Sequence, residues 1–91
     1  ATEAVTSPMK HVVLTVSHIP GRDPVYTFNE KASGFPSRGS VTSVGMDGKL
    51  SQGSAFALAE ILTGLRGAEL EGASIEVRDR DEGWVEEAWD F

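Results

Sequence analysis

The stretch from Leu50 to Gly67 constrains the fold most, because its apolar residues have the spacing of an amphipathic helix. At about 100° per residue, six of them fall within one broad sector: Ala55, Leu58, Ala59, Ile61, Leu62 and Leu65. Ser51 or Ser54 can cap the first turn, and Gly67 lies where helices favour a left-handed terminal residue. A helix with one apolar face has to bury that face, so the rest of the chain must supply a complementary surface.

The other apolar residues alternate with polar residues over short stretches, which is typical of half-buried β-strands. The expected strands span residues 11–17, 25–29, 41–46, 73–78 and 84–91. Glycines and prolines separate several of them, and residues 30–40 and 68–72 are expected to be connecting segments. The last strand has an alternative as a helix, because four of its residues also lie at helical spacing: Trp84, Val85, Ala88 and Trp89.

The alternation also predicts which side chains form the core. In the first strand, Val12, Leu14 and Val16 share the side that is expected to face the helix. In the second strand, the aromatic side with Tyr26 and Phe28 is expected to be the buried one. Three residues of the last strand are expected on one side of it: Val85, Trp89 and Phe91.

These elements follow one another in the order β-β-β-α-β-β. They predict an α+β fold in which an antiparallel sheet of about five short strands carries the helix on one face. The 91 residues are enough for one such domain. Residues 1–9 lack periodicity and contain Pro8, so we expect a flexible N-terminal arm followed by a single α+β domain at residues 10–91.

The negative charge is concentrated in the last quarter of the chain. The formal net charge of the whole chain is −6. Residues 1–68 contain five acidic and six basic residues, whereas residues 69–91 contain nine acidic and two basic residues. Such a surface repels phosphate backbones and attracts basic proteins. We therefore expect a protein partner with a basic surface and no direct binding of nucleic acid.

The composition excludes several classes of site. The chain has no cysteine, so disulfides, thiolate zinc sites and cysteine nucleophiles are excluded. No apolar run approaches the ~20 residues of a membrane-spanning helix, and the N-terminus lacks the basic-then-apolar pattern of a secretory signal. The default expectation is therefore a cytoplasmic protein without a membrane partner.

No motif for catalysis or cofactor binding stands out. The segment Asp79–Gly83 has the alternate carboxylates of a calcium loop, but Trp84 stands where that loop needs glycine and Asp90 where it needs glutamate. A solvated turn is the better interpretation. In a regular strand, His11 and His18 would point to opposite faces and could not share a metal, unless a bulge near His18 changed this. We expect no enzyme activity, no cofactor and no metal.

The acidic last quarter is the strongest candidate for a functional surface. Six carboxylates lie within twelve residues there, interleaved with two tryptophans that can supply a large contact area. The predicted partner-binding residues are Asp79, Asp81, Glu82, Trp84, Glu86, Glu87, Trp89 and Asp90. The alternative is that the tryptophans fill the core and the acidic residues only keep the chain in solution.

Three residues elsewhere are predicted as secondary contacts. Phe56 projects from the polar side of the helix, where the alternative is that a loop or the C-terminus covers it. Arg22 and Asp23 lie at the tip of the loop between the first two strands, which Pro20 and Pro24 restrict.

The predicted function is a small, acidic, non-enzymatic protein-binding module, such as an inhibitor, an immunity-type protein or a phage-type regulator. It would dock on a basic surface of its partner. The alternative is a structural assembly subunit of a virion or surface array, which would form homo-oligomers through edge strands and the arm at residues 1–9. A small hydrolase using His18 ranks third, because the sequence contains no Gly-x-Ser-x-Gly nucleophile elbow.

Overall fold

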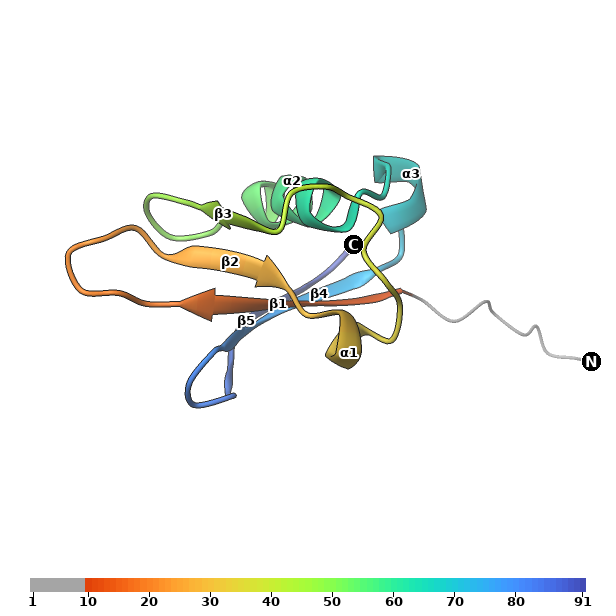
Figure 1. Cartoon of the computed structure of the whole chain (residues 1–91). Helices are drawn as coiled ribbons and strands as arrows, with labels where there is room; N and C mark the ends of the chain where they lie inside the picture. Colours follow the sequence, from red (N-terminus) through yellow and green to blue (C-terminus); the bar gives the residue numbers. More distant parts are fainter. Residues whose placement is uncertain (1–9) are drawn as a thin grey trace, which may run out of the picture.

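The computed structural model describes residues 10–91, so the arm predicted at residues 1–9 lies outside the described residues. This part has five strands: β1 (His11–Ser17), β2 (Val25–Phe28), β3 (Ser43–Gly45), β4 (Ser74–Asp79) and β5 (Val85–Asp90). It has three helices: α1 (Glu30–Ser33), α2 (Gln52–Thr63) and α3 (Gly67–Leu70). The fold is α+β, and the strands form one sheet with α2 on one of its faces (Figure 1).

The sheet is mixed, which corrects the prediction of an antiparallel sheet. Its strand order is β3-β2-β1-β4-β5. β1 is antiparallel to β2 but parallel to β4, with His11 opposite Ser74 and Val16 opposite Asp79. The β2–β3 and β4–β5 pairs are antiparallel. The parallel pair arises because the chain passes through β3, α2 and α3 before it returns to the free side of β1, and parallel neighbours need such a crossover.

The predicted core faces of the first two strands are confirmed. Val12, Leu14 and Val16 are fully buried, and they belong to the same apolar cluster as the buried rings of Tyr26 and Phe28. The cluster also contains the apolar face of α2 and the inner residues of β4, namely Leu58, Ala59, Leu62, Ile75 and Val77. The core therefore lies between the sheet and α2.

The opposite face of β1 is covered near its start by α1. Val13 is fully buried, and its N–H donates to Ser33 Oγ in α1 at 2.9 Å. In Figure 1, α1 and α2 lie on opposite sides of the sheet. The rest of this second face is formed by polar or half-exposed residues of β1 and β4, such as Thr15 and Glu76.

The C-terminal end of α2 differs from the prediction. The helix ends at Thr63, and Gly64 takes the left-handed conformation with φ +76° that was expected of Gly67. The loop before β3 sets this end, because the Arg38 N–H donates to the Thr63 carbonyl at 2.7 Å and satisfies a carbonyl of the last turn. Gly67 instead begins α3.

The start of α2 agrees with the prediction. Ser51 is the N-cap, and its Oγ accepts a hydrogen bond from the Ser54 N–H at 3.2 Å. One residue of the predicted apolar sector is not in the core: Ile61 is 48% exposed. It lies on the flank of the helix that faces away from the sheet, so the buried stripe is narrower than the sequence pattern indicates.

Two helices were not predicted. Residues 30–33 and 68–70 were expected to lie in connecting segments, but residues 30–33 and 67–70 each form a single helical turn. α1 is capped by the Asn29 side chain, which accepts from the Ala32 N–H at 3.0 Å, and α3 is anchored by the fully buried Leu70. A helix of one turn has no apolar periodicity, which is why the pattern did not show it.

The C-terminal segment forms a strand and not the alternative helix. β4 and β5 make an antiparallel hairpin, and Gly83 takes φ +79° in its turn, close to the expected position. The third predicted strand is also present, but β3 spans only Ser43–Gly45 of the expected residues 41–46.

Candidate functional site: the β4–β5 hairpin

A β-bulge in β5 decides where the acidic side chains of the hairpin point. Val77 lies opposite Glu87, but the next residue, Arg78, lies opposite Val85, so Glu86 is an extra residue in β5. Directly opposed residues of an antiparallel pair share a face. Val85 therefore lies on the face of Arg78, away from α2. The prediction that Val85 and Trp89 share one side of the strand is wrong.

The bulge brings both Glu86 and Glu87 to the α2 side of the sheet. The pKa of Tyr26 reflects this arrangement: burial raises it above its ordinary value, and the negative charges of Glu86 and Glu87 raise it further. Tyr26 belongs to β2, and two strands, β1 and β4, lie between β2 and β5 in the sheet. The carboxylates of β5 thus contribute to a negative potential across this end of the sheet.

Three of the six predicted carboxylates are engaged within the chain. Asp79 Oδ2 accepts hydrogen bonds from the N–H groups of Asp81 at 3.0 Å and Glu82 at 2.6 Å, which fixes the hairpin turn. Glu86 contacts the His18 ring, with Nε2 2.8 Å from Oε2. Glu87 Oε1 lies 3.6 Å from Lys49 Nζ.

The other three predicted carboxylates are exposed. Asp81 and Glu82 lie in the turn, and Asp90 is the last residue of β5. None of the three forms an ion pair with another of the described residues 10–91. Their charges are therefore available to a partner.

The two tryptophans have different environments. Trp84 directly precedes β5 and is 63% exposed, and the neighbouring Val85 is 53% exposed. Trp89 lies opposite Ile75 and packs, partly buried, against the core cluster. Trp84 therefore has the exposure of a contact residue, whereas Trp89 contributes to the core. We call the set Asp81, Glu82, Trp84, Val85 and Glu86 the hairpin patch.

β5 is also an edge strand with a free side. The Phe91 N–H donates to the Ala73 carbonyl at 2.9 Å, toward β4. Hydrogen-bonding directions alternate along an antiparallel strand, so the backbone groups of Ala88 and Asp90 point away from β4. Since β5 is last in the strand order, no strand within residues 10–91 pairs with these groups. Edge groups of this kind can form hydrogen bonds with an added strand.

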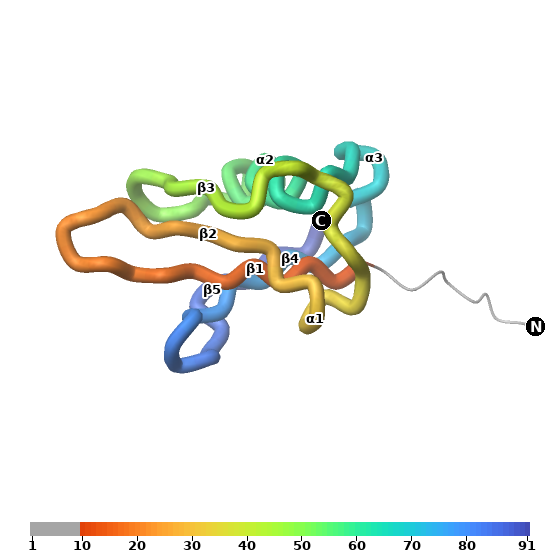
Figure 2. The backbone as a smooth tube through the Cα atoms, in the orientation of Figure 1, coloured from red at the N-terminus to blue at the C-terminus, as the bar shows by residue number. Residues whose placement is uncertain are grey.

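The predicted secondary contacts do not all belong to this surface. Phe56 is partly buried, and its ring centroid lies 5.0 Å from that of Phe91, so the C-terminus covers it. Arg22 and Asp23 are exposed in the β1–β2 loop. That loop and the β4–β5 turn are separate projections (Figure 2), which both follow the carboxyl ends of the parallel strands β1 and β4.

The two histidines contact different carboxylates at opposite ends of β1. His11 Nε2 lies 2.6 Å from Glu76 Oε1, and His11 Nδ1 lies 2.7 Å from Ser74 Oγ. Arg78 Nε donates to Glu76 Oε2 at 2.7 Å and is the largest cause of the lowered pKa of Glu76. This network links β1 to β4 on the face of the sheet opposite α2.

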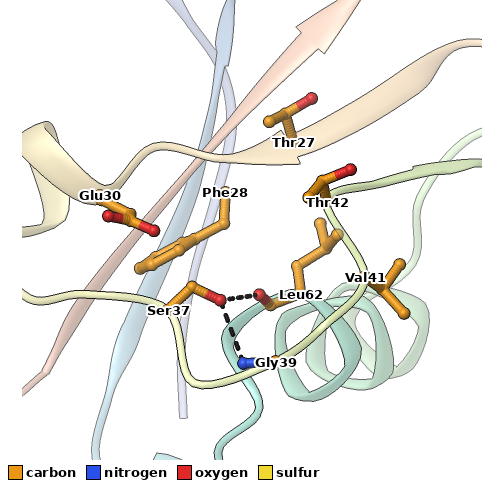
Figure 3. Close-up of a pocket in the computed structure, with 8 residues that line it drawn as sticks. All are labelled: Thr27, Phe28, Glu30, Ser37, Gly39, Val41, Thr42 and Leu62. Atoms are coloured by element: carbon orange, nitrogen blue, oxygen red, sulfur yellow. Dashed lines mark hydrogen bonds between the residues drawn. The ribbon is translucent and has the colours of Figure 1, made fainter.

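A shallow pocket of about 320 Å³ lies between the end of β2, the loop before β3 and α2 (Figure 3). Phe28 and Leu62 form its apolar wall, and Glu30 contributes a charged side chain. Ser37 Oγ donates to the Leu62 carbonyl at 2.8 Å and holds the loop against the helix. No local pattern predicts this pocket, because its lining comes from three segments brought together only by the tertiary fold.

Comparisons with models of protein families, with curated proteins and with solved structures found no match. Among residues 10–91, no helix has both the length and the apolar character required to cross a membrane. Function is therefore inferred from the surface chemistry described above.

Proposed function

We propose that this chain is a non-enzymatic protein-binding module that docks on a basic surface of a partner protein through the hairpin patch. The observation that carries the proposal is the exposure of Trp84, 63% of whose surface remains accessible, beside carboxylates that form no ion pair with another of residues 10–91. Large aromatic residues dominate the binding energy of protein interfaces, and surrounding charges steer the approach of the partner. An inhibitor, an immunity-type protein or a phage-type regulator would use such a surface.

The charges around Trp84 favour a basic partner. Asp81 and Glu82 flank it on the turn side without ion pairs among the described residues, and Glu86 follows it in the bulge. Apolar contact area surrounded by like charges binds best to a surface of opposite sign. Nucleic acid is disfavoured because its phosphates would be repelled by the same carboxylates.

The test compares two double charge reversals of equal size. Asp81→Lys with Glu82→Lys changes the hairpin patch, whereas Asp47→Lys with Glu71→Lys changes two exposed acidic residues elsewhere. The partner is captured from an extract of the source organism, identified by mass spectrometry and purified, and its Kd is measured by surface plasmon resonance. We expect the first variant to lose binding by tenfold or more, roughly 1.4 kcal/mol, and the second to bind as the wild type does.

The Trp84→Ala variant distinguishes the contribution of the Trp84 contact area from that of electrostatic steering by the carboxylates. We expect it to weaken binding by about 2 kcal/mol, roughly 30-fold in Kd, mainly through faster dissociation. The charge-reversed variant should instead bind more slowly and lose its salt dependence. Binding that is unchanged in both variants would contradict the proposal.

We propose the structural assembly subunit as a second candidate, favoured by the free edge of β5. Pairing β5 with β5 of a second copy would bring acidic residues together, which is unfavourable. Pairing β5 with the other edge strand, the uncharged β3, avoids this repulsion and gives a head-to-tail assembly. The part that residues 1–9 would play lies outside the described residues.

Sedimentation velocity over a range of concentrations tests this second candidate. If copies associate through β5, Ala88→Pro should abolish concentration-dependent oligomers, because it removes an N–H that points away from β4. Ala88→Val retains the N–H and is the matched control. Oligomers that persist in Ala88→Pro, or a wild-type chain that stays monomeric at all concentrations, would exclude this mode of assembly.

A further inference from the structure

We propose that His18, Asp79 and Glu86 form a binding site for a divalent first-row transition metal ion such as Zn²⁺. The three residues come from different elements: His18 follows β1, Asp79 ends β4, and Glu86 is the bulge residue of β5. One ligand atom of each lies within 4.8 Å of the others. The proposal does not depend on the partner-binding function proposed above.

The mixed sheet explains why residues so far apart in sequence converge. Because β1 and β4 are parallel and Val16 lies opposite Asp79, the chain emerges from both strands at the same end of the sheet. His18 is two residues beyond Val16 and therefore lies beside Asp79. The bulge then turns Glu86 to the same side of the sheet, which a regular β5 would not do.

The ligand chemistry favours a transition metal over Mg²⁺ or Ca²⁺. One imidazole nitrogen and two carboxylates are ligands that Zn²⁺ and its neighbours accept, whereas Mg²⁺ and Ca²⁺ prefer oxygen ligands alone. Two ligands held at about 2.1 Å from a tetrahedral Zn²⁺ ion lie about 3.4 Å apart. His18 Nε2 and Glu86 Oε2 are already 2.8 Å apart, and the exposed His18 side chain can rotate toward Asp79.

The carboxylate of Asp79 is held in place by the hairpin turn. Its Oδ2 accepts two backbone N–H groups, which leaves Oδ1 for an ion. The Arg80 N–H donates to the Val16 carbonyl at 2.9 Å and fixes the end of β4 against β1. Three protein ligands leave further positions of the ion for water, as in open metal sites.

The surrounding charges also favour a cation. Glu87 lies next to Glu86 on the α2 side, and Asp81 and Glu82 are in the adjoining turn. Two cations lie nearby: Lys49 is 3.6 Å from Glu87, and an Arg80 nitrogen is 3.5 Å from Ser17 Oγ. The carboxylates outnumber these cations, so the local field attracts a divalent ion.

His11 is a matched control for His18 in the same chain. This ring also contacts a carboxylate, that of Glu76, but its second neighbour is the Ser74 hydroxyl, and Arg78 already binds Glu76. Within residues 10–91 it is therefore an imidazole–carboxylate pair without a third metal ligand. His11→Gln and His18→Gln remove the same group from the two ends of β1, and only His18→Gln removes a proposed ligand.

Isothermal titration calorimetry with ZnCl₂, using the full chain, tests the site. We expect one Zn²⁺ per chain, with the affinity lowered by about tenfold or more in His18→Gln and in Glu86→Gln and unchanged in His11→Gln. MgCl₂ should not compete. Circular dichroism checks that each variant is folded, and Zn²⁺ should raise the Tm of the wild type and of His11→Gln but not of His18→Gln.

Nuclear magnetic resonance of the imidazole nitrogens gives an independent reading of the same site. One equivalent of Zn²⁺ should shift the ring signals of His18 and leave those of His11 in place. The proposal is overturned if the wild type binds no Zn²⁺, if His18→Gln binds it as tightly as the wild type, or if His11→Gln loses affinity equally.

Discussion

Replacing Gly64 with alanine is expected to lower the free energy of unfolding by about 2–5 kcal/mol. Gly64 has φ +76°, a conformation that costs other residues about 1–2 kcal/mol. A Cβ at this position would also lie 2.5 Å from the Arg38 carbonyl carbon and 2.8 Å from Gly39 Cα, both backbone atoms. Moving that loop away from α2 adds about 1–3 kcal/mol of overpacking.

Gly48→Ala is the matched control for Gly64→Ala. Gly48 has nearly the same backbone angle, φ +77°, but a Cβ there would meet no atom within 4 Å. Its substitution therefore measures the conformational cost alone, and urea denaturation of both variants separates the two terms. Equal losses of stability in the two variants would show that the loop before β3 does not pack tightly on the end of α2.

Leu14→Ala is expected to be the other strongly destabilising change, by about 2–5 kcal/mol. Leu14 is fully buried in the middle strand of the sheet, opposite Phe28 of β2 and Val77 of β4. Both neighbouring strands hold the space around it, so the cavity left by alanine cannot collapse easily. The loss is measured as a lower midpoint of urea denaturation with an unchanged slope.

Ile61→Ala removes a side chain of the same size from the exposed flank of α2. Since Ile61 is 48% exposed, we expect its loss to cost about 1 kcal/mol or less. Similar costs at positions 14 and 61 would contradict the placement of the core between β1 and α2.

Local patterns predicted the elements of this fold better than their arrangement. The alternation of Val12, Leu14 and Val16 defined β1 and its buried face, and Ser51 marked the start of α2. The parallel direction of β4 was not predictable in this way, because a half-buried strand such as Ser74–Asp79 shows the same alternation in either direction. The choice depends on the crossover through α2, which is a property of the whole chain.

The end of α2 shows a similar limit. Gly64 and Gly67 are three residues apart, but only Gly67 follows the whole apolar stripe, because Leu65 lies between them, so the sequence pattern favours an end at Gly67. The loop around Arg38 determines where the helix ends, because the Arg38 N–H donates to the Thr63 carbonyl and the loop packs against Gly64. A contact between segments about 25 residues apart leaves no local signal.

The acidic hairpin was visible in the sequence because its charges are contiguous. Its internal arrangement was not, since the contact of His18 with Glu86 spans 68 residues and depends on the strand register and on the bulge. Trp84 and Trp89 likewise look equivalent in the sequence. Only the pairing of Trp89 with Ile75 separates the half-buried ring from the exposed one.

The parallel pairing of β1 with β4 also determines when the sheet can be completed during folding. Its partners, such as His11 and Ser74, are 63 residues apart, so the pair cannot form until β4 has been synthesised. Until then β1 has one open side, and the core lacks Ile75 and Val77. The hairpin patch takes its final position beside β1 only when this pair has formed, so a partner that recognises it would select folded copies over incomplete ones.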